Sequence, residues 1–329
     1  MPYRLKVIHR STAISLAFAL SLVAGLALGA CAGQSPGGTA APTISATTQS
    51  GAPSTFNPDT YQPRAIAVAS LAPRFAYDTT APLDVVTKAT RHQVGATIQT
   101  ITYRSGADLI TAEVVSPTAH HGRLAGVVYA HGGQLNDPDA FLADALAIVK
   151  HGAVAIMPDV GMTMVGNATT DLTYVVNAVI AERRAIDVLL ARSDVDPRRL
   201  AFVGHSWGAE LAAIMTGAEP RLDAVAIVCG WSRMSTDMAD TASVADVPPY
   251  LDTTTVLDGF RYIAIKGKRK ILIQYGKQDP NIPQVQRTEL TKAAVGASVT
   301  RKDYDAGHDL VGDASAAAGR QAFLIAALH

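Results

Sequence analysis

The sequence predicts an α/β protein whose central sheet is mostly parallel and carries helices on both faces. Short apolar runs alternate along the chain with segments in which apolar residues recur at helical spacing. Runs of this length between helices are typical of βαβ units, whose parallel strands are buried on both sides. Because ligands in such sheets bind beyond the carboxyl ends of the strands, the residues that follow each run are the first candidates for a site.

The folded part is predicted to begin between residues 65 and 95. Its first two strands are joined by a hairpin-type connection at 105–108. The expected strands are 96–103, 109–115, 125–130, 153–157, 200–203, 222–229, 270–274 and 298–303. The expected helices are 139–150, 170–192, 209–216, 284–295 and a last helix that ends near Leu328.

Residues 1–30 are predicted to be a signal peptide. Arg4, Lys6 and Arg10 precede an uncharged, mostly apolar stretch at 11–30 that ends in small residues. A membrane-spanning anchor is the alternative interpretation, because about twenty apolar residues can cross a bilayer.

The end of this stretch, Leu28-Gly29-Ala30-Cys31, resembles the lipobox of bacterial lipoproteins. In those proteins the cysteine takes a lipid and becomes the new N-terminus. The resemblance implies an exported protein that is anchored by a lipid on Cys31 and faces outside the cytoplasm. An uncleaved anchor and a plain secreted form are the alternatives.

The composition of the rest of the chain predicts a tether followed by one domain, and it argues against one class of partner. Residues 31–65 are rich in small and polar types and almost uncharged, so they are predicted to form a flexible tether before a single domain at 66–329. Lys+Arg and Asp+Glu number 28 each, and without a basic surplus nucleic acid is not an expected partner. Oligomeric state is not predicted.

The histidines and cysteines give no reason to expect a metal, a cofactor or a disulfide. The nine histidines show neither an H-E-x-x-H spacing nor a Cys/His cluster. Cys229 is the only cysteine besides Cys31, and with Cys31 lipidated no pair remains within the chain. Because Cys229 ends an apolar run, it is expected to be a buried strand residue that behaves as a small hydrophobe.

A nucleophile is predicted where the run at 200–203 ends. The sequence there is Gly204-His205-Ser206-Trp207-Gly208 and continues as a helix. A G-x-S-x-G turn between a strand and a helix raises the serine hydroxyl above the sheet edge, and the flanking glycines avoid clashes with neighbouring backbone. The helix N-terminus favours negative charge that develops beside Ser206.

A carboxylate and a histidine follow later strand ends. Asp279 lies just beyond the run at 270–274, and His308 follows the predicted strand 298–303 in a glycine turn. A nucleophilic serine needs an imidazole base, and the imidazole needs a carboxylate that orients it and stabilises its cation. We therefore predict a catalytic triad in the chain order Ser206, Asp279, His308.

These motifs, together with His131-Gly132-Gly133, give the chain from about residue 96 onward a resemblance to the α/β-hydrolases. Within that superfamily it is similar to dienelactone-hydrolase-like and prolyl-oligopeptidase-like esterases. Dienelactone hydrolases themselves use cysteine as the nucleophile, so the resemblance does not extend to their substrate. It implies an α/β-hydrolase fold and a serine hydrolase that acts on small-molecule carboxylic esters without a cofactor.

The resemblance also implies an oxyanion hole made of backbone N–H groups. One donor is expected from Trp207, the residue after the nucleophile. The second is expected from the loop after the third strand, where Gly133 is the first choice and Gly132 and Gln134 are alternatives.

An insertion at 231–262 is expected to form a small cap over the site. Its apolar residues either line an acyl or alcohol pocket or pack only on one another. Two other functions use the same residues differently: a peptidase or amidase with the same triad, and a lipid-anchored binding protein that keeps the fold without activity. The substrate, its acyl-chain preference and the mobility of the insertion are not predicted.

Overall fold

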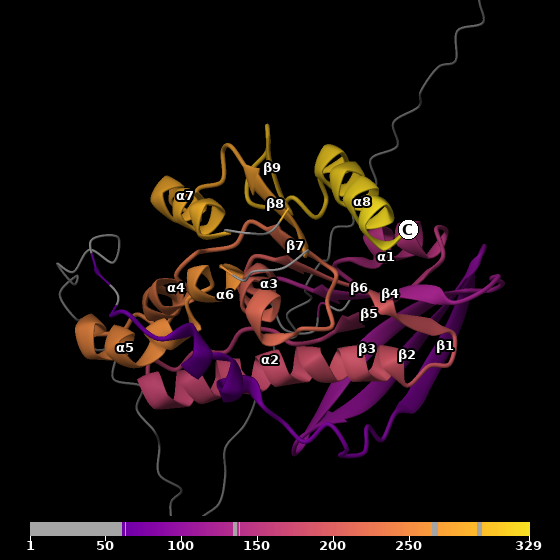
Figure 1. The fold of residues 1–329 in the computed structure, drawn as a ribbon, viewed down its shortest axis with the longest axis horizontal. Coiled ribbons are helices and arrows are strands. Elements are labelled where there is room, and N and C mark those ends of the chain that lie inside the picture. Colours follow the sequence, from indigo (N-terminus) through magenta and orange to yellow (C-terminus); the bar gives the residue numbers. More distant parts are fainter. Residues whose placement is uncertain (1–60, 63, 134–136, 138, 265–268, 295–297) are drawn as a thin grey trace, which may run out of the picture. The chain divides into compact units, whose positions relative to one another are not determined.

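The computed structural model describes residues 61–62, 64–133, 137, 139–264, 269–294 and 298–329 (Figure 1). The predicted signal peptide, Cys31, most of the predicted tether and Gln134 lie outside the described residues. None of the helices in the described part of the chain is long and apolar enough to cross a membrane.

The elements follow one another as the alternation of apolar runs and helical segments predicts. The strands are β1 (Val86–Gln93), β2 (Ala96–Ser105), β3 (Asp108–Pro117), β4 (Leu124–Ala130), β5 (Ala153–Pro158), β6 (Val195–His205), β7 (Ala224–Val228), β8 (Lys270–Gly276) and β9 (Ser298–Tyr304). The helices are α1 (Leu142–Val149), α2 (Ala168–Leu190), α3 (Trp207–Ala218), α4 (Met234–Thr241), α5 (Val247–Thr254), α6 (Phe260–Ile263), α7 (Gln284–Ala293) and α8 (Ala314–Leu328).

The strands form a nine-stranded sheet in the order β1-β2-β3-β5-β4-β6-β7-β8-β9. Strands β1, β2 and β3 are joined in antiparallel pairs, as are β3 and β5, whereas the pairs from β5 to β9 are parallel. All carboxyl ends of the parallel strands therefore meet at one edge. The fold class, an α/β-hydrolase sheet that is mostly parallel, is confirmed.

Helices cover both faces of this sheet because its central strands are apolar on both sides. In β4, Val127 and Tyr129 pack in a core with α1 and α8, while Val128 packs in the core on the other face with α2 and α3. Figure 1 shows α8 and α2 on opposite sides of the sheet. The hydrophobic effect thus fixes which face each helix covers.

Strand β1 was not predicted from the sequence. All of its residues are exposed, and it pairs only with β2 at the sheet edge. A strand without a buried face leaves no alternating apolar pattern in the sequence. As a consequence, the loop at His131 follows the fourth strand, not the third.

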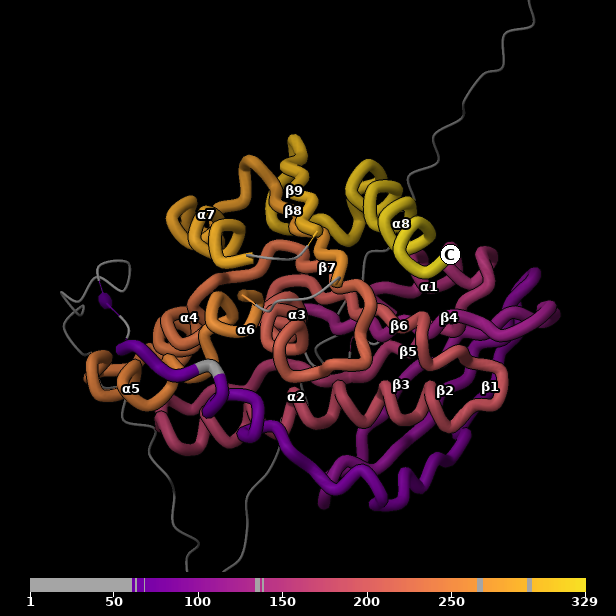
Figure 2. The backbone as a smooth tube through the Cα atoms, in the orientation of Figure 1, coloured from indigo at the N-terminus to yellow at the C-terminus, as the bar shows by residue number. Residues whose placement is uncertain are grey.

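The 231–262 insertion is mostly helical and is tied to the first described residues of the chain. It contains α4, α5 and α6. The Tyr61 hydroxyl donates to Asp252 Oδ1 of α5 over 2.7 Å, and the Tyr61 carbonyl accepts from Arg233 Nη1. Figure 2 shows this first segment passing α5 and then running along α2. The packed part of the chain therefore includes Tyr61, which falls inside the segment predicted as tether.

Candidate active site

Ser206 stands alone between β6 and α3 in a strained backbone conformation. Its φ of 54° and ψ of −117° lie outside the regions that most residues adopt. The Ser206 N–H donates to the Val228 carbonyl at the end of β7 over 2.9 Å, which holds the turn against the neighbouring strand. Strain of this kind persists only where surrounding structure enforces it, and it is concentrated at functional sites.

The two glycines of this turn are required by close backbone packing. A Cβ on Gly204 would lie 1.9 Å from the Gly208 carbonyl oxygen, and one on Gly208 would lie 2.1 Å from that of Ala130. The turn can therefore form only with glycine at both positions. It also brings the start of α3 against the end of β4, where the Gly208 N–H donates to the His131 carbonyl.

The structure brings Ser206, His308 and Asp279 together in one hydrogen-bonded chain. Ser206 Oγ lies 2.9 Å from His308 Nε2, and His308 Nδ1 lies 2.9 Å from Asp279 Oδ2. Because an ionised carboxylate can only accept, Nδ1 carries the proton and Nε2 is the free acceptor for the serine hydroxyl. This arrangement suits removal of a proton from Ser206 while Asp279 stabilises the cation that forms.

Asp279 is held in its ionised form. Its side chain is fully buried, and this burial alone would raise the pKa. Hydrogen bonds from His308 and from the Asn281 backbone N–H outweigh burial, so the pKa of Asp279 falls below its usual range.

A buried arginine holds the loop that carries Asp279. This acid loop (residues 276–282) accepts three hydrogen bonds from Arg287 of α7, at the carbonyls of Gly276, Asp279 and Ile282, over 2.7 to 2.8 Å. Arg287 is only 7% exposed and forms no salt bridge within the described part of the chain. Its side chain therefore replaces the backbone partners that this irregular loop lacks.

A second buried arginine holds the loop that carries His308. In this base loop (residues 307–312), the carbonyls of Leu310 and Val311 accept hydrogen bonds from Arg320 of α8. Arg320 also forms a buried ion pair with Asp144 of α1, with Nε to Oδ2 at 2.8 Å. The base loop is thus connected to α1, which packs in the same core as α8.

His205 contacts His308 from the nucleophile turn. Its Nε2 lies 3.0 Å from the His308 carbonyl oxygen, and the two rings lie 5.1 Å apart. Burial lowers the pKa of His205 to about 4, so the ring is neutral at neutral pH and its Nε2–H donates to that carbonyl. His205 therefore holds the base while adding no positive charge beside it.

The predicted oxyanion residues lie close to each other beside Ser206. A Cβ on Gly133 would lie 3.9 Å from the Trp207 Cβ, and Trp207 itself is fixed by a bond from its indole N–H to the Val160 carbonyl. Gly133 and Gly132 line the same cavity as Ser206 and His308. Both glycines therefore belong to the site, and the role of their N–H groups stays a prediction.

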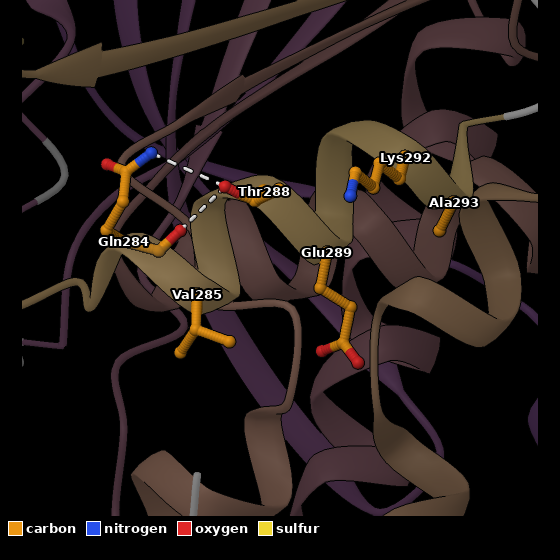
Figure 3. A pocket seen from close by; sticks show the side chains of 6 residues that line it. All are labelled: Gln284, Val285, Thr288, Glu289, Lys292 and Ala293. Carbon is orange, nitrogen blue, oxygen red and sulfur yellow. Dashed lines mark hydrogen bonds between the residues drawn. The ribbon is translucent and has the colours of Figure 1, made fainter.

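This cavity of about 770 Å³ lies where the carboxyl ends of the strands meet. It is lined by Gly132, Gly133, Asp137, Ala140, Ala143, Asp144, Met162, His205, Ser206, Asn281, His308, Asp309, Val311 and Gly312. A second hollow of about 570 Å³ is lined only by residues of α7, from Gln284 to Ala293 (Figure 3). It contains no member of the triad, so the first cavity is the candidate site.

A comparison with protein families shows which family the chain belongs to. Residues 110–314 match the model of the dienelactone hydrolase family. The chain belongs to this family. Membership places the chain among the hydrolases. Its predicted nucleophile is Ser206, whereas dienelactone hydrolases themselves use a cysteine. No curated protein sequence matched the chain.

Solved structures share the fold of this dienelactone hydrolase family member at low identity. Acetyl xylan esterase 1 from Thermoanaerobacterium sp. JW/SL YS485 is 16% identical, with a TM-score of 0.66 over 80% of this chain and 94% of that one. An S-formylglutathione hydrolase from Agrobacterium tumefaciens is 15% identical, with a TM-score of 0.59 over 74% and 99%. A prolyl endopeptidase is 18% identical, with a TM-score of 0.56 over 71% of this chain and 39% of that one.

Cys229 has a contact in this family member that the sequence did not indicate. It is buried as predicted, but it stands one residue beyond β7 with a φ of 54°. Its thiol lies within 4.8 Å of the Asp279 carboxylate, and burial raises its pKa to about 12, so it stays protonated. Cys229, Asp279 and His308 are the one group of potential metal ligands found within the described residues, with ligand atoms within 4.8 Å. With a protonated thiol and an Asp–His bond already formed, the group as it stands is arranged for proton transfer.

Proposed function

We propose that this member of the dienelactone hydrolase family is a serine hydrolase that cleaves carboxylic esters through an acyl-enzyme. The observation that carries the proposal is the chain of two 2.9 Å contacts from Ser206 through His308 to Asp279. That two of the solved structures with this fold are named as an acetyl xylan esterase and an S-formylglutathione hydrolase supports ester cleavage.

In the proposed reaction, His308 Nε2 takes the hydroxyl proton as Ser206 Oγ attacks the ester carbonyl. The negative charge on the carbonyl oxygen is stabilised by the backbone N–H groups of Trp207 and Gly133. His308 then protonates the departing alcohol, and water, activated by the same imidazole, releases the acid from Ser206. No cofactor takes part in these steps.

Labelling with a fluorophosphonate tests the nucleophile directly. We expect one adduct, located at Ser206 by mass spectrometry, and no adduct in Ser206→Ala. Ser315→Ala, which changes an exposed serine on α8, is the matched control and is expected to label like the wild type. Failure of the wild type to label, or labelling that persists in Ser206→Ala, contradicts the proposal and favours a binding protein or another nucleophile.

Turnover of a p-nitrophenyl ester and of a matched peptide amide separates an esterase from a peptidase with the same triad. We expect ester cleavage to be faster by more than the difference in the intrinsic reactivity of the two substrates. An amide cleaved at the rate of the ester contradicts the esterase assignment and leaves the triad intact.

We also propose that the protein is exported and held at the membrane by a lipid on Cys31. The support is the sequence alone, a charged start and apolar stretch that end in Leu28-Gly29-Ala30-Cys31. Cys31→Ser is expected to move the protein out of the cleaved, membrane-bound fraction. A native N-terminus that lies beyond residue 31 and carries no lipid contradicts the anchor.

A further inference from the structure

The charged side chains that line the catalytic cavity are all acidic. Among its described lining residues, Asp137, Asp144 and Asp309 carry carboxylates, and none is a lysine or an arginine. Residues 134–136 and 138, which flank Asp137 in the sequence, are Gln, Leu, Asn and Pro and carry no charge. In a chain with 28 basic and 28 acidic residues, a cavity with one sign of charge is a local departure from the average.

Two of the three carboxylates are not neutralised by a cation. Asp144 is paired with Arg320, which is not among the residues that line the cavity. Asp137 and Asp309 form no salt bridge within the described part of the chain, in contrast to Asp139 and Asp305 close to them in the sequence. Asp309 Oδ1 accepts only the backbone N–H groups of Val311 and Gly312, over 3.2 and 3.3 Å, which leaves its charge in place.

The field of these carboxylates reaches the reacting groups. Asp309 directly follows His308, and its charge acts on the His205 imidazole in the nucleophile turn. In the 231–262 insertion, Asp237 of α4 interacts electrostatically with His308. Burial raises the pKa of Asp237 to about 6, so this carboxyl is also mostly ionised at neutral pH. The imidazoles of His205 and His308, beside Ser206, are thus acted on by the negative charges of Asp309 and Asp237, while Arg320 acts on His205 in the opposite sense.

We propose that Asp137 and Asp309 make this cavity selective for esters that carry a positive charge near the scissile bond, and that they exclude anionic esters. This inference rests on the proposed function, because it concerns the substrate of the same Ser206 site. A unit charge about 8 Å from a carboxylate changes kcat/KM by roughly two- to thirtyfold, depending on the effective dielectric constant. Low-dielectric cavity walls focus this field on the entering substrate.

Matched acetate esters test the proposal. Acetylcholine, its uncharged isostere in which carbon replaces the quaternary nitrogen, and the acetate of a sulfonate-bearing alcohol differ mainly in charge. At low ionic strength, kcat/KM is expected to fall in that order. The spread should shrink as salt rises, because the Debye length drops from about 10 Å at 0.1 M to about 3 Å at 1 M.

The double variant Asp137→Asn/Asp309→Asn identifies the source of the selectivity. Asparagine keeps the acceptor oxygen that the turn after Asp309 uses, so the loop is retained while both charges are removed. The ratio of cationic to neutral kcat/KM is expected to approach one. Asp305→Asn is the control, because Asp305 is exposed, pairs with Lys277 and does not line the cavity; this variant should keep the wild-type ratio.

If the acetates are turned over too slowly, the affinities of aryl trifluoromethyl ketones give the same comparison. Their trimethylammonium, tert-butyl and sulfonate substituents supply a cationic, a neutral and an anionic ligand. A wild-type cationic-to-neutral ratio of one or less, or a ratio that the double variant does not lower, overturns the inference while Ser206 labelling still supports the hydrolase. Absence of labelling at Ser206 overturns the proposed function itself, so the two failures are distinguishable.

Discussion

The acid loop and the base loop are both held in place by a buried arginine, but the two arginines have different partners. Each is an irregular segment beyond a strand end, and each is held by a buried arginine from the helix that follows it. All of the hydrogen bonds that the Arg287 guanidinium makes within the described residues go to the backbone of the acid loop. Arg320 instead divides its donors among the base loop, Gln274 of β8 and Asp144 of α1.

This difference shows which half of the triad depends on distant structure. The acid loop is held by Arg287 of its own following helix, so the position of Asp279 depends less on distant structure than that of His308 does. The base loop is held through an ion pair to α1, which also lines the catalytic cavity through Asp144. Changes near the cavity wall should therefore move His308 before they move Asp279.

The largest expected effect is on turnover in Asp279→Asn. A neutral amide does not stabilise the His308 imidazolium as the carboxylate does, and it favours the wrong imidazole tautomer; the same change in the triad of a serine protease costs about ten thousandfold in kcat. The fold should be retained, because Arg287 bonds backbone carbonyls and asparagine still accepts from the Asn281 N–H. Steady-state kinetics with circular dichroism measures both. Near-normal turnover in this folded variant would place the acid elsewhere.

Arg287 with the acid loop and Arg320 with the base loop are referred to as the two arginine clamps. Their contributions to stability should differ most clearly in a double-mutant cycle. Arg320→Met leaves Asp144 as a buried charge without a partner, which typically costs about 3–5 kcal/mol of unfolding free energy. Adding Asp144→Asn should recover part of this loss. Arg287→Met leaves buried carbonyls unsatisfied, at about 1–3 kcal/mol for each group that finds no water.

Asp144→Asn should give no such recovery in the Arg287→Met background, because the two side chains belong to separate clamps. Denaturant unfolding of the single and double variants measures the coupling. Equal coupling of Asp144 to both arginines would show that the loops are not independent.

The sequence predicted the parts of the fold and site that depend on local pattern. Buried parallel strands leave apolar runs, and a nucleophile turn needs its two glycines, so both the sheet and the position of Ser206 could be read directly. The exposed β1 left no such pattern. The clamps could not be predicted, because Arg287 and Arg320 are ordinary helix residues in sequence and acquire a partner only when α7 and α8 pack behind the loops. His205 and Cys229 likewise gain their contacts with His308 and Asp279 from strands that meet only in the folded sheet.

The smallest expected effect is the sign of the pH dependence of stability, which should be opposite for the two clamped loops. Asp279 has a pKa lowered from 3.8, so its contribution is present above that value and is lost as pH falls through the folded pKa. Asp144 has a pKa raised from 3.8, because burial outweighs the bonds from Arg320. Its contribution is complete below 3.8 and declines as pH rises through the folded pKa.

Unfolding free energies of the wild type, Asp279→Asn and Asp144→Asn between roughly pH 3 and pH 7 measure these slopes. The advantage of the wild type over Asp279→Asn should grow with pH, while its advantage over Asp144→Asn should shrink. Because both variants replace a carboxyl with an amide of the same shape, a change in packing alone gives an offset without a slope. Slopes of the same sign would mean that the Asp144–Arg320 pair stabilises the ionised carboxylate after all, and that the base loop is held as firmly by charge as the acid loop is by its backbone bonds.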